Sequence, residues 1–397
     1  MNTNADGNAT IHPALVGSLS TTAPSDAVIN FSPGPTSLPK AVEKEITANF
    51  NKPGLTSLAL SHRSPEFVTI LDHAIASARR VMAIPDDYVV LFTHGGGHGQ
   101  FAALPLNLCQ TQSDVATYVV NGTWSSRGRD EAQKYCQVQT VDGRDPKTGQ
   151  FTTFPELTEA NIDAKSRFVY VCSNETVNGI ELHRLPKLPE SRRHIPLVVD
   201  ASSDFSTKPI AWHDDGVGVL FACASKNIGH PGLTMTVVRK DLLGKASPLC
   251  PGVFNYSINN EAGNLWNTPA TFNIEVVGLV MDWLEREGGV VENERRCIAK
   301  AKVLYEVIDN SSGFYATPVQ NKALRSRMNI PFNVKGGDEA LTNKFLIKSW
   351  EEGMIGLRTL TPFGAGDYLR ASLYNGVTIE EATRLADFMQ QFARENA

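Results

Sequence analysis

The chain has 397 residues, which is long enough for two domains and a large core. Its 37 basic and 42 acidic residues give a net charge of −5, which argues against nucleic acid or an anionic membrane as the main partner. Six scattered cysteines show no metal-binding spacing, so we expect reduced thiols, no metal centre and a cytoplasmic protein.

Residues 1–27 are rich in Thr, Ser, Ala and Asn, and the first basic residue is Lys40. A signal peptide needs a charged start and an apolar centre, and a transit peptide needs arginines. Neither pattern is present, so residues 1–27 are predicted to form a disordered leader. No apolar run approaches the roughly 18 residues that span a bilayer, and we expect no membrane partner.

The first predicted helix follows Ser64, which can cap it, and Pro65, which is tolerated at the first helical position. Apolar residues then recur at three- and four-residue spacing as far as Val81, and Pro85 ends the pattern. The next segment, 88–92, is a short apolar run and predicts a strand.

Glycines at 95–97 and 99 follow this strand and lead into a helix predicted to begin near Gln100. Short apolar strands are then predicted at 116–120, 167–172, 196–200, 217–222 and 235–238. Because helical segments lie between several of them, we expect an α/β domain over residues 28–270, with a mostly parallel sheet covered by helices on both faces.

The pattern changes near Thr271, where long helical patterns cover 274–284 and 298–308. Strands are predicted near 327–334 and 368–373, with an amphipathic helix at 341–352 between them. The last helix is predicted to begin near Ile379, capped by Thr378. These elements suggest a smaller α+β domain over residues 271–397.

Lys226 follows the apolar strand 217–221 and lies among small residues, where solvation is poor. Desolvation lowers the pKa of an amine, and a neutral amine can form a Schiff base with an aldehyde cofactor. A single strand-end lysine is usually a solvated surface residue, but Asp200 closes another apolar strand. Pyridoxal phosphate requires both a lysine for its aldehyde and an acid beside its pyridinium nitrogen. The pair therefore indicates pyridoxal phosphate as the cofactor.

Three further features fit this cofactor, although each has a plainer explanation. The glycine run 95–99 offers backbone N–H groups and a helix N-terminus to a phosphate, yet such runs are usually plain turns. Trp124 follows a strand and could stack on a planar ring, or could simply be a core residue. Thr176 lies in a polar turn and could donate to a ring oxygen.

The arrangement resembles the phosphoserine aminotransferase family, which consists of pyridoxal phosphate-dependent enzymes of aminotransferase class V with the fold type I architecture. The resemblance runs from about Ile29 to the C-terminus. The matching segments are Phe-Ser-Pro-Gly-Pro at 31–35, Ser-His-Arg-Ser at 61–64, Cys-Ser-Asn-Glu-Thr at 172–176, Lys-Asn-Ile-Gly at 226–229, Asn-Thr-Pro at 267–269 and Arg-Ala-Ser-Leu-Tyr-Asn at 370–375.

The resemblance implies a role for each matching position around the cofactor. Lys226 would form the Schiff base and move the proton between substrate and cofactor, and Asp200 would pair with the pyridinium nitrogen. Trp124 would stack on the ring, and Thr176 would bind its phenolic oxygen. Gly97 and His98 would hold the phosphate through their backbone N–H groups.

Other positions imply substrate contacts and a homodimer with shared active sites. Asn267 and Thr268 would reach the phosphate from the neighbouring subunit. Arg370 would clamp the substrate α-carboxylate through two parallel hydrogen bonds, which a lysine could not reproduce. His62 and Arg63 would face the distal anion of the substrate.

The chain departs from the family pattern next to Lys226 and before Arg370. Ser225 stands where the family usually has Gln, but serine keeps a donor, so we expect cofactor binding to survive. Where the family carries a His-Arg pair that grips the substrate phosphate, this chain has Phe363 and Gly364. Losing such a contact typically costs about 2–5 kcal/mol. The pocket is therefore expected to prefer a distal group that is smaller, less charged or apolar.

The leading hypothesis is an aminotransferase that uses glutamate and 2-oxoglutarate as one substrate pair. The partner keto acid would be either 3-phosphohydroxypyruvate, which implies serine biosynthesis, or a specialised non-phosphorylated acid. A second hypothesis is pyridoxal phosphate-dependent elimination or replacement at Cβ of a small amino acid. A catalytically silent binding or scaffold protein is disfavoured because Lys226, Asp200, Thr176 and Arg370 are all present.

Overall fold

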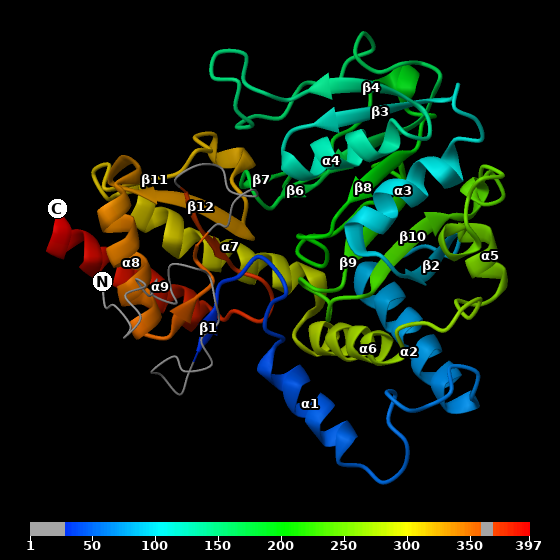
Figure 1. The fold of residues 1–397 in the computed structure, drawn as a ribbon, viewed down its shortest axis with the longest axis horizontal. Helices are drawn as coiled ribbons and strands as arrows, with labels where there is room; N and C mark the ends of the chain where they lie inside the picture. The colour runs from blue at the N-terminus through cyan, green and yellow to red at the C-terminus, as the bar shows by residue number, and fades with distance from the viewer. Residues whose placement is uncertain (1–27, 359–367) are drawn as a thin grey trace, which may run out of the picture.

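The computed structural model describes residues 28–358 and 368–397 (Figure 1). The predicted leader and the segment with Phe363 and Gly364 lie outside these residues. A seven-stranded sheet with the order β2-β10-β9-β8-β5-β3-β4 forms the larger part of the molecule. Its strands are β2 (Tyr88–Thr93), β3 (Val115–Val120), β4 (Gln137–Asp142), β5 (Ser166–Cys172), β8 (Leu197–Asp200), β9 (Val217–Cys223) and β10 (Thr234–Arg239).

The predicted mostly parallel sheet is confirmed. Strands β9, β8, β5, β3 and β4 run parallel to one another, while β10 is antiparallel to both β9 and β2. Every predicted strand of this region is present. The edge strand β4 was not predicted because only Val141 in it is fully buried, so it lacks an apolar run.

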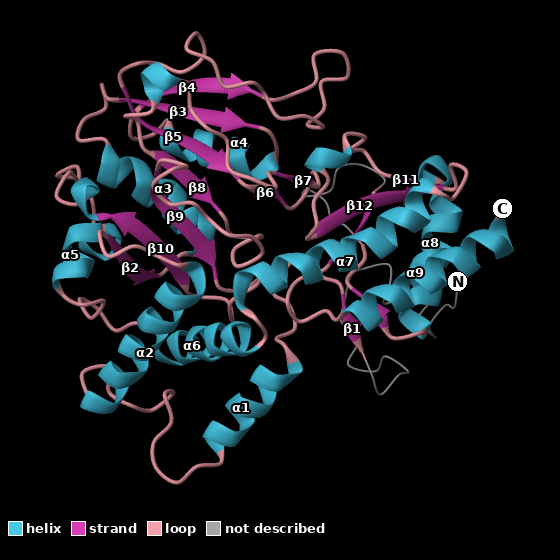
Figure 2. Ribbon diagram, turned by 180° about the vertical axis from the view of Figure 1, so that it is seen from behind, coloured by secondary structure: helices cyan, strands magenta, loops and turns pink. Residues whose placement is uncertain are grey.

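Helices cover both faces of the sheet, as Figure 2 shows from behind. Alternate residues of β2 point to opposite faces: Val90 and Phe92 pack in one core, and Val89 and Leu91 in the other. The first core includes side chains of α2 (Pro65–Met82) and α6 (Thr271–Arg286). The second includes side chains of α3 (Gly96–Leu108) and α4 (Thr123–Ala132).

The predicted cap of α2 is confirmed, because Ser64 Oγ accepts a hydrogen bond of 3.3 Å from the Phe67 N–H. Helix α3 begins at Gly96, slightly earlier than the predicted start near Gln100. Two further helices of this region, α1 (Lys40–Phe50) and α5 (Tyr256–Glu261), were not predicted.

The remaining elements form a smaller sheet with its own core. Strands β11 (Tyr315–Ala316), β12 (Asn329–Val334) and β14 (Leu369–Ser372) are antiparallel and pack with α7 (Gly289–Asp309), α8 (Glu339–Glu351) and α9 (Ile379–Asn396). The predicted cap of α9 is confirmed, since Thr378 Oγ1 accepts from Glu381 N and Glu381 Oε2 accepts from Thr378 N.

The start of the described chain joins this smaller part. Strand β1 (Ile29–Asn30) pairs in parallel with β13 (Met354–Ile355), and Ile29 lies in the smaller core. Helix α6, in contrast, packs in the core of the large sheet. A boundary between residues 270 and 271 stays a prediction; we propose that the division lies between α6 and α7, at Gly288 and Gly289, whose φ angles are 99° and 71°.

Among the described residues, no helix is both long and apolar enough to cross a membrane. Within the same ranges, no group of three or more His, Cys, Asp or Glu side chains is arranged to hold a metal ion.

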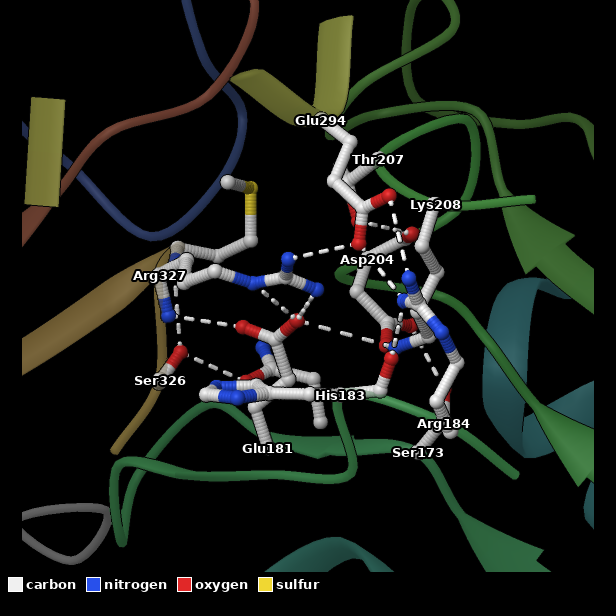
Figure 3. Close-up of polar contacts among 12 residues, drawn as sticks. Ser173, Glu181, His183, Arg184, Asp204, Thr207, Lys208, Glu294, Ser326 and Arg327 are labelled. Carbon is white, nitrogen blue, oxygen red and sulfur yellow. Dashed lines mark hydrogen bonds and ion pairs between the residues drawn. The ribbon is translucent and has the colours of Figure 1, made fainter. Parts of the chain in front are cut away.

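A buried network of charged side chains links the two parts beside the large sheet (Figure 3). Arg327, just before β12, donates from Nε to Glu181 Oε1 at 2.9 Å and from Nη1 to Glu294 Oε1 of α7 at 3.0 Å. Lys208 Nζ lies 3.6 Å from Glu181 Oε1 and bonds to Asp204. Each charge of this network therefore has an opposite partner, which offsets the cost of its burial.

Acidification is expected to weaken this network. The first group to take up a proton is expected to be His183, whose ring lies near Glu181 in Figure 3. Burial lowers the pKa of His183 below its ordinary value of 6.5, against the pull of Glu181. The unfolded chain therefore binds the proton more tightly, so the contribution of His183 to stability is complete above pH 6.5 and is lost as the pH falls below it. Urea unfolding between pH 8 and pH 5.5, compared with His183→Gln, isolates this loss; identical pH slopes for the two proteins would contradict it.

Candidate active site

A cavity of about 750 Å³ lies where the carboxyl ends of the large-sheet strands meet the smaller part. Many of its lining residues are site residues predicted from the sequence: Gly97, His98, Trp124, Thr176, Asp200, Ser225, Lys226 and Arg370. Residues 30 and 32–35, the end of α8 and residues 354–358 are among the other residues that line it. The structure therefore brings together side chains that are far apart along the chain.

Lys226 follows β9 and extends into this cavity. Its Nζ donates to Thr176 Oγ1 at 3.3 Å and lies 5.6 Å from the centre of the Trp124 ring. The backbone carbonyl of Lys226 accepts from Thr36 Oγ1 at 3.0 Å. A Cβ atom on Gly34 would lie 3.4 Å from Lys226 Cγ, so the segment before Thr36 packs directly on the lysine.

The predicted lowering of the Lys226 pKa is wrong in its net direction. Burial does lower the pKa of this amine, and it is the largest single influence. Tyr374, Cys223 and Asp200 act against burial, however, and together they raise the pKa above its ordinary value of 10.5. An amine with a raised pKa must lose a proton before it can attack an aldehyde.

Asp200 ends β8 with a buried carboxylate whose two oxygens are both held. Oδ1 accepts from the Ser202 N–H at 2.9 Å, and Oδ2 accepts from the Tyr170 hydroxyl at 3.1 Å. Burial raises the pKa of Asp200, while Ser202, Lys226 and Tyr170 partly offset this rise. The Tyr170 ring is itself fixed by stacking on Tyr118 at 4.7 Å. The carboxylate thus keeps one orientation at the cavity floor.

Trp124 is positioned by a buried acid, Glu175, that the sequence reasoning did not identify as a site residue. Glu175 accepts from the backbone N–H groups of Trp124 at 2.8 Å and Ser125 at 2.7 Å, at the start of α4. An acid is stabilised at this end of a helix. A Cβ atom on Gly122 would lie 2.3 Å from the Glu175 carboxyl carbon, so only glycine permits this approach.

The start of α3, where a phosphate cradle was predicted, has a backbone that can receive an anion. Gly95 and Gly96 adopt φ angles of 92° and 60°, which favour glycine. A Cβ atom on Gly99 would lie 2.9 Å from the His94 carbonyl oxygen. Gly97 and His98 occupy the first turn of α3 and line the cavity, where N–H groups that lack a helical partner can bind an anion.

Arg370 of β14 is a buried cation with spare hydrogen-bonding capacity. Its Nη1 donates to the Thr176 carbonyl at 2.9 Å, and its side chain has no carboxylate within 4.0 Å in the part of the chain that the structure describes. Its buried Nε finds no hydrogen-bond partner there. Burial lowers the pKa of this guanidinium, with Tyr374 acting against it. A buried charge of this kind is stabilised when an anion joins it.

Four predicted site residues do not line the cavity of their own chain. His62 and Arg63 lie in the loop before α2, and Asn267 and Thr268 lie between α5 and α6. Phe363 lies outside the described residues. Their predicted contacts with substrate or cofactor phosphate stay predictions.

Tyr374 is a further residue of the site, and no role was predicted for it from the sequence. Its hydroxyl donates to the Pro33 carbonyl at 3.2 Å and accepts from Asn329 Nδ2 at 3.1 Å. It is the largest influence that raises the pKa of Lys226. The sequence signal that could have identified Tyr374 as a site residue is its place in the matching segment 370–375.

These residues fit pyridoxal phosphate. The amine of Lys226 and the carboxylate of Asp200 face one cavity, Trp124 supplies a ring beside them, and the first turn of α3 supplies the anion cradle. Ser202 and Ser225 add hydroxyl donors to the same wall.

Comparisons with known proteins agree with this assignment. The model of the family Aminotransferase class-V matches residues 28–385. Phosphoserine aminotransferase of Drosophila melanogaster is 40% identical, over 93% of this chain and 99% of the fly protein. The enzyme of the same name from Ralstonia pickettii (strain 12J) is 39% identical, over 93% of this chain and 96% of its own length.

Solved structures give the same result. The phosphoserine aminotransferase from Bacillus circulans subsp. alkalophilus is 31% identical, with a TM-score of 0.86 over 94% of this chain and 100% of that one. The PLP-bound enzyme from Trichomonas vaginalis is 30% identical, with a TM-score of 0.83 over 92% of this chain and 100% of that one. The chain therefore belongs to the phosphoserine aminotransferase family, within the class V aminotransferases of fold type I that use pyridoxal phosphate.

Proposed function

We propose that this aminotransferase transfers an amino group between glutamate or 2-oxoglutarate and a small keto acid. One observation carries the proposal: Thr176 accepts from Lys226 through its hydroxyl and from Arg370 through its carbonyl. Thr176 therefore holds the amine of Lys226 and the guanidinium of Arg370 close together. An α-amino acid likewise carries its reacting amino group and its carboxylate on one carbon atom. The α-carboxylate would bind Arg370 while the amino group faces Lys226.

Each residue then has a defined task. Pyridoxal phosphate supplies an aldehyde and an electron-withdrawing ring when it is bound. Lys226 Nζ would act as a general base that removes the proton from the substrate Cα. It would then act as a general acid and give the proton up in the next step, so that the proton moves between substrate and cofactor. The fixed carboxylate of Asp200 would hold a positive ring nitrogen, and Arg370 would orient the substrate.

The partner keto acid is 3-phosphohydroxypyruvate if this chain acts as the names of its relatives indicate, which would place it in serine biosynthesis. A specialised non-phosphorylated acid is the other candidate, because Phe363 and Gly364 replace the family's His-Arg pair. We propose the cytoplasm as the location.

We also propose a homodimer with shared active sites. Asn267, Thr268, His62 and Arg63 lie outside their own cavity, so they would serve the cavity of a second copy. Large apolar side chains are exposed close to these residues in sequence, including Leu55 (70% exposed), Leu58 (64%) and Trp266 (48%). Burying such side chains between two copies would stabilise the assembly.

A panel of amino acids tests the function. Purified protein loaded with pyridoxal phosphate is mixed with glutamate, phosphoserine, serine or alanine, and bleaching of the cofactor absorption band is followed, with identification of the keto acid formed. Glutamate is expected to bleach the band and to yield 2-oxoglutarate. Release of pyruvate or of a β-substituent with no keto-acid requirement would instead show chemistry at Cβ.

Arg370→Lys tests the proposed carboxylate clamp. Lysine keeps the charge but loses the planar pair of donors, so kcat/KM for glutamate is expected to fall by about 100-fold. Far-UV circular dichroism checks the fold. The absorption band of the bound cofactor, measured without substrate, should be the same as in the wild type. Wild-type kcat/KM in this variant would mean that the α-carboxylate binds elsewhere.

A further inference from the structure

Arg358 is a second arginine at the cavity to which neither the sequence reasoning nor the proposed function gives a role. It lies just after β13 and lines the cavity together with Arg370. With Lys226, these are the only lysine or arginine side chains among the described residues of the cavity wall.

Tight backbone contacts fix the position of Arg358. Gly356 has a φ of 78°, and a Cβ atom there would lie 2.2 Å from Ser32 Oγ. Only glycine therefore allows the backbone at position 356 to pack this closely against Ser32, just after β1. Arg370 N donates to the Leu357 carbonyl at 2.8 Å. The residue next to Arg358 is therefore hydrogen-bonded to Arg370 itself, and the two arginines start from adjoining backbone segments.

Within the described part of the chain, no acid neutralises the charge of Arg358. The side chain is half-buried, and its one hydrogen bond within residues 28–358 and 368–397 is a 3.5 Å contact from Nη1 to Asn343 Oδ1. No carboxylate of these residues lies within 4.0 Å of its guanidinium, whereas Arg327 and Arg325 each bind one or more acids.

The wall around Arg358 strengthens its effect on an anion. Leu346, Trp350 and Met354 line the same side of the cavity and supply apolar surface. Attraction between opposite charges increases where such surface replaces water. An anionic group that reaches this side would find one cation, Arg358, held beside the arginine that faces the α-carboxylate.

We propose that Arg358 binds the second anionic group of the substrates, a carboxylate or a phosphate, while Arg370 binds the α-carboxylate. This inference rests on the proposed function and names its substrate class: amino and keto acids with two anionic ends. It differs from the prediction based on Phe363 and Gly364, which was a smaller, less charged or apolar distal group. The reason is that Arg358, at another position in the chain, still supplies a cation to the cavity.

Matched substrates test the proposal with holoenzyme of the wild type, Arg358→Gln and Arg358→Lys. Each acidic substrate is paired with a neutral one, glutamate with glutamine and phosphoserine with serine. For Arg358→Gln we expect kcat/KM to fall by about 30-fold with an acidic substrate and to stay unchanged with its neutral partner. Arg358→Lys should keep part of the preference. Arg295→Gln, an exposed arginine of α7, is the charge-matched control and should behave as wild type.

Calorimetry supplies a readout that does not depend on turnover. Succinate and inorganic phosphate are titrated into wild type and Arg358→Gln, and weaker binding of either ion by the variant supports the proposal. A loss confined to glutamate and succinate assigns a carboxylate, and one confined to phosphoserine and phosphate assigns a phosphate.

Equal losses with acidic and neutral substrates, or no loss in either experiment, would overturn the role of Arg358. Failure of the proposed function would look different, because wild type would then transaminate none of the amino acids. Ion binding by wild type and Arg358→Gln would still decide the role of Arg358 in that case.

Discussion

Replacing Lys226 by alanine is expected to lower the rate of amino-group transfer by at least about 10³-fold, since a positioned general acid-base group alone contributes up to about 10⁴-fold. The Nζ atom is the amine nearest the Trp124 ring in the cavity, and it is held by Thr176. No other lysine lines the described cavity wall, so no neighbour can take over its proton transfer. Single-turnover bleaching of the cofactor band by glutamate measures the effect.

Two controls separate chemistry from folding in this variant. Lys134→Ala removes an exposed lysine paired with Glu131 and should leave the rate unchanged. Added methylamine should partly restore the rate of Lys226→Ala, because a small amine can occupy the space left by the side chain. Borohydride reduction of wild type should fix the cofactor to the peptide that contains Lys226. Labelling of any other peptide would remove Lys226 from the proposed mechanism.

The parts of the site that could be predicted from the sequence are those with a local signal. Asp200 and Lys226 follow short apolar runs, and parallel strands bring their carboxyl ends to one edge. The glycine run before α3 signals a turn that few other residues could adopt. Edge strand β4 gave no such signal because its side chains are largely exposed.

Contacts between distant segments could not be predicted in the same way. Glu175 meets the start of α4 only because β6 (Asn174–Glu175) folds against that helix. The net direction of the Lys226 pKa depends on Tyr374, Cys223 and Asp200, which come from three separate segments. Burial alone predicted the opposite direction, and only the assembled neighbours reverse it.

The position of Arg358 illustrates the same limit. No local pattern singles out Arg358 itself, and its distance along the chain from Lys226 hides their common cavity. The contact of Gly356 with Ser32 and the bond from Arg370 to Leu357 bring it there. With the proposed role of Arg358, specificity would depend on packing between the segments that follow β1 and β13 and strand β14.

Arg327→Met is expected to lower the free energy of unfolding by about 3–5 kcal/mol, the usual cost of leaving a buried ion without its partner. Arg327 is 6% exposed and binds both Glu181 and Glu294. Methionine fills much of the same space, so the loss reports charge rather than a cavity. Among the described residues, Lys208 would be the one cationic side chain left within 4.0 Å of Glu181, at 3.6 Å, while the backbone N–H of residue 327 would still donate to this carboxylate.

The network also supports the active site, which makes this variant informative beyond stability. Ser173 Oγ lies 2.6 Å from Asp204 Oδ1 and 3.1 Å from the Asp200 carbonyl oxygen, so its single proton connects the network to the chain at Asp200. Loosening of the ion network is therefore expected to weaken cofactor binding as well. Urea or thermal unfolding and a cofactor titration measure the two effects on the same protein.

An exposed ion pair provides the matched control, because Arg144 and Asp142 are bonded but lie in solvent. Arg144→Met should change stability very little, as expected for surface pairs. The double variant Glu181→Gln with Arg327→Met should lose less than the sum of the two single losses, since each single change already breaks the shared pair. Additive losses, or an Arg327→Met effect as small as that of Arg144→Met, would mean that these buried charges do not act as a unit holding β12 and α7 to the large sheet.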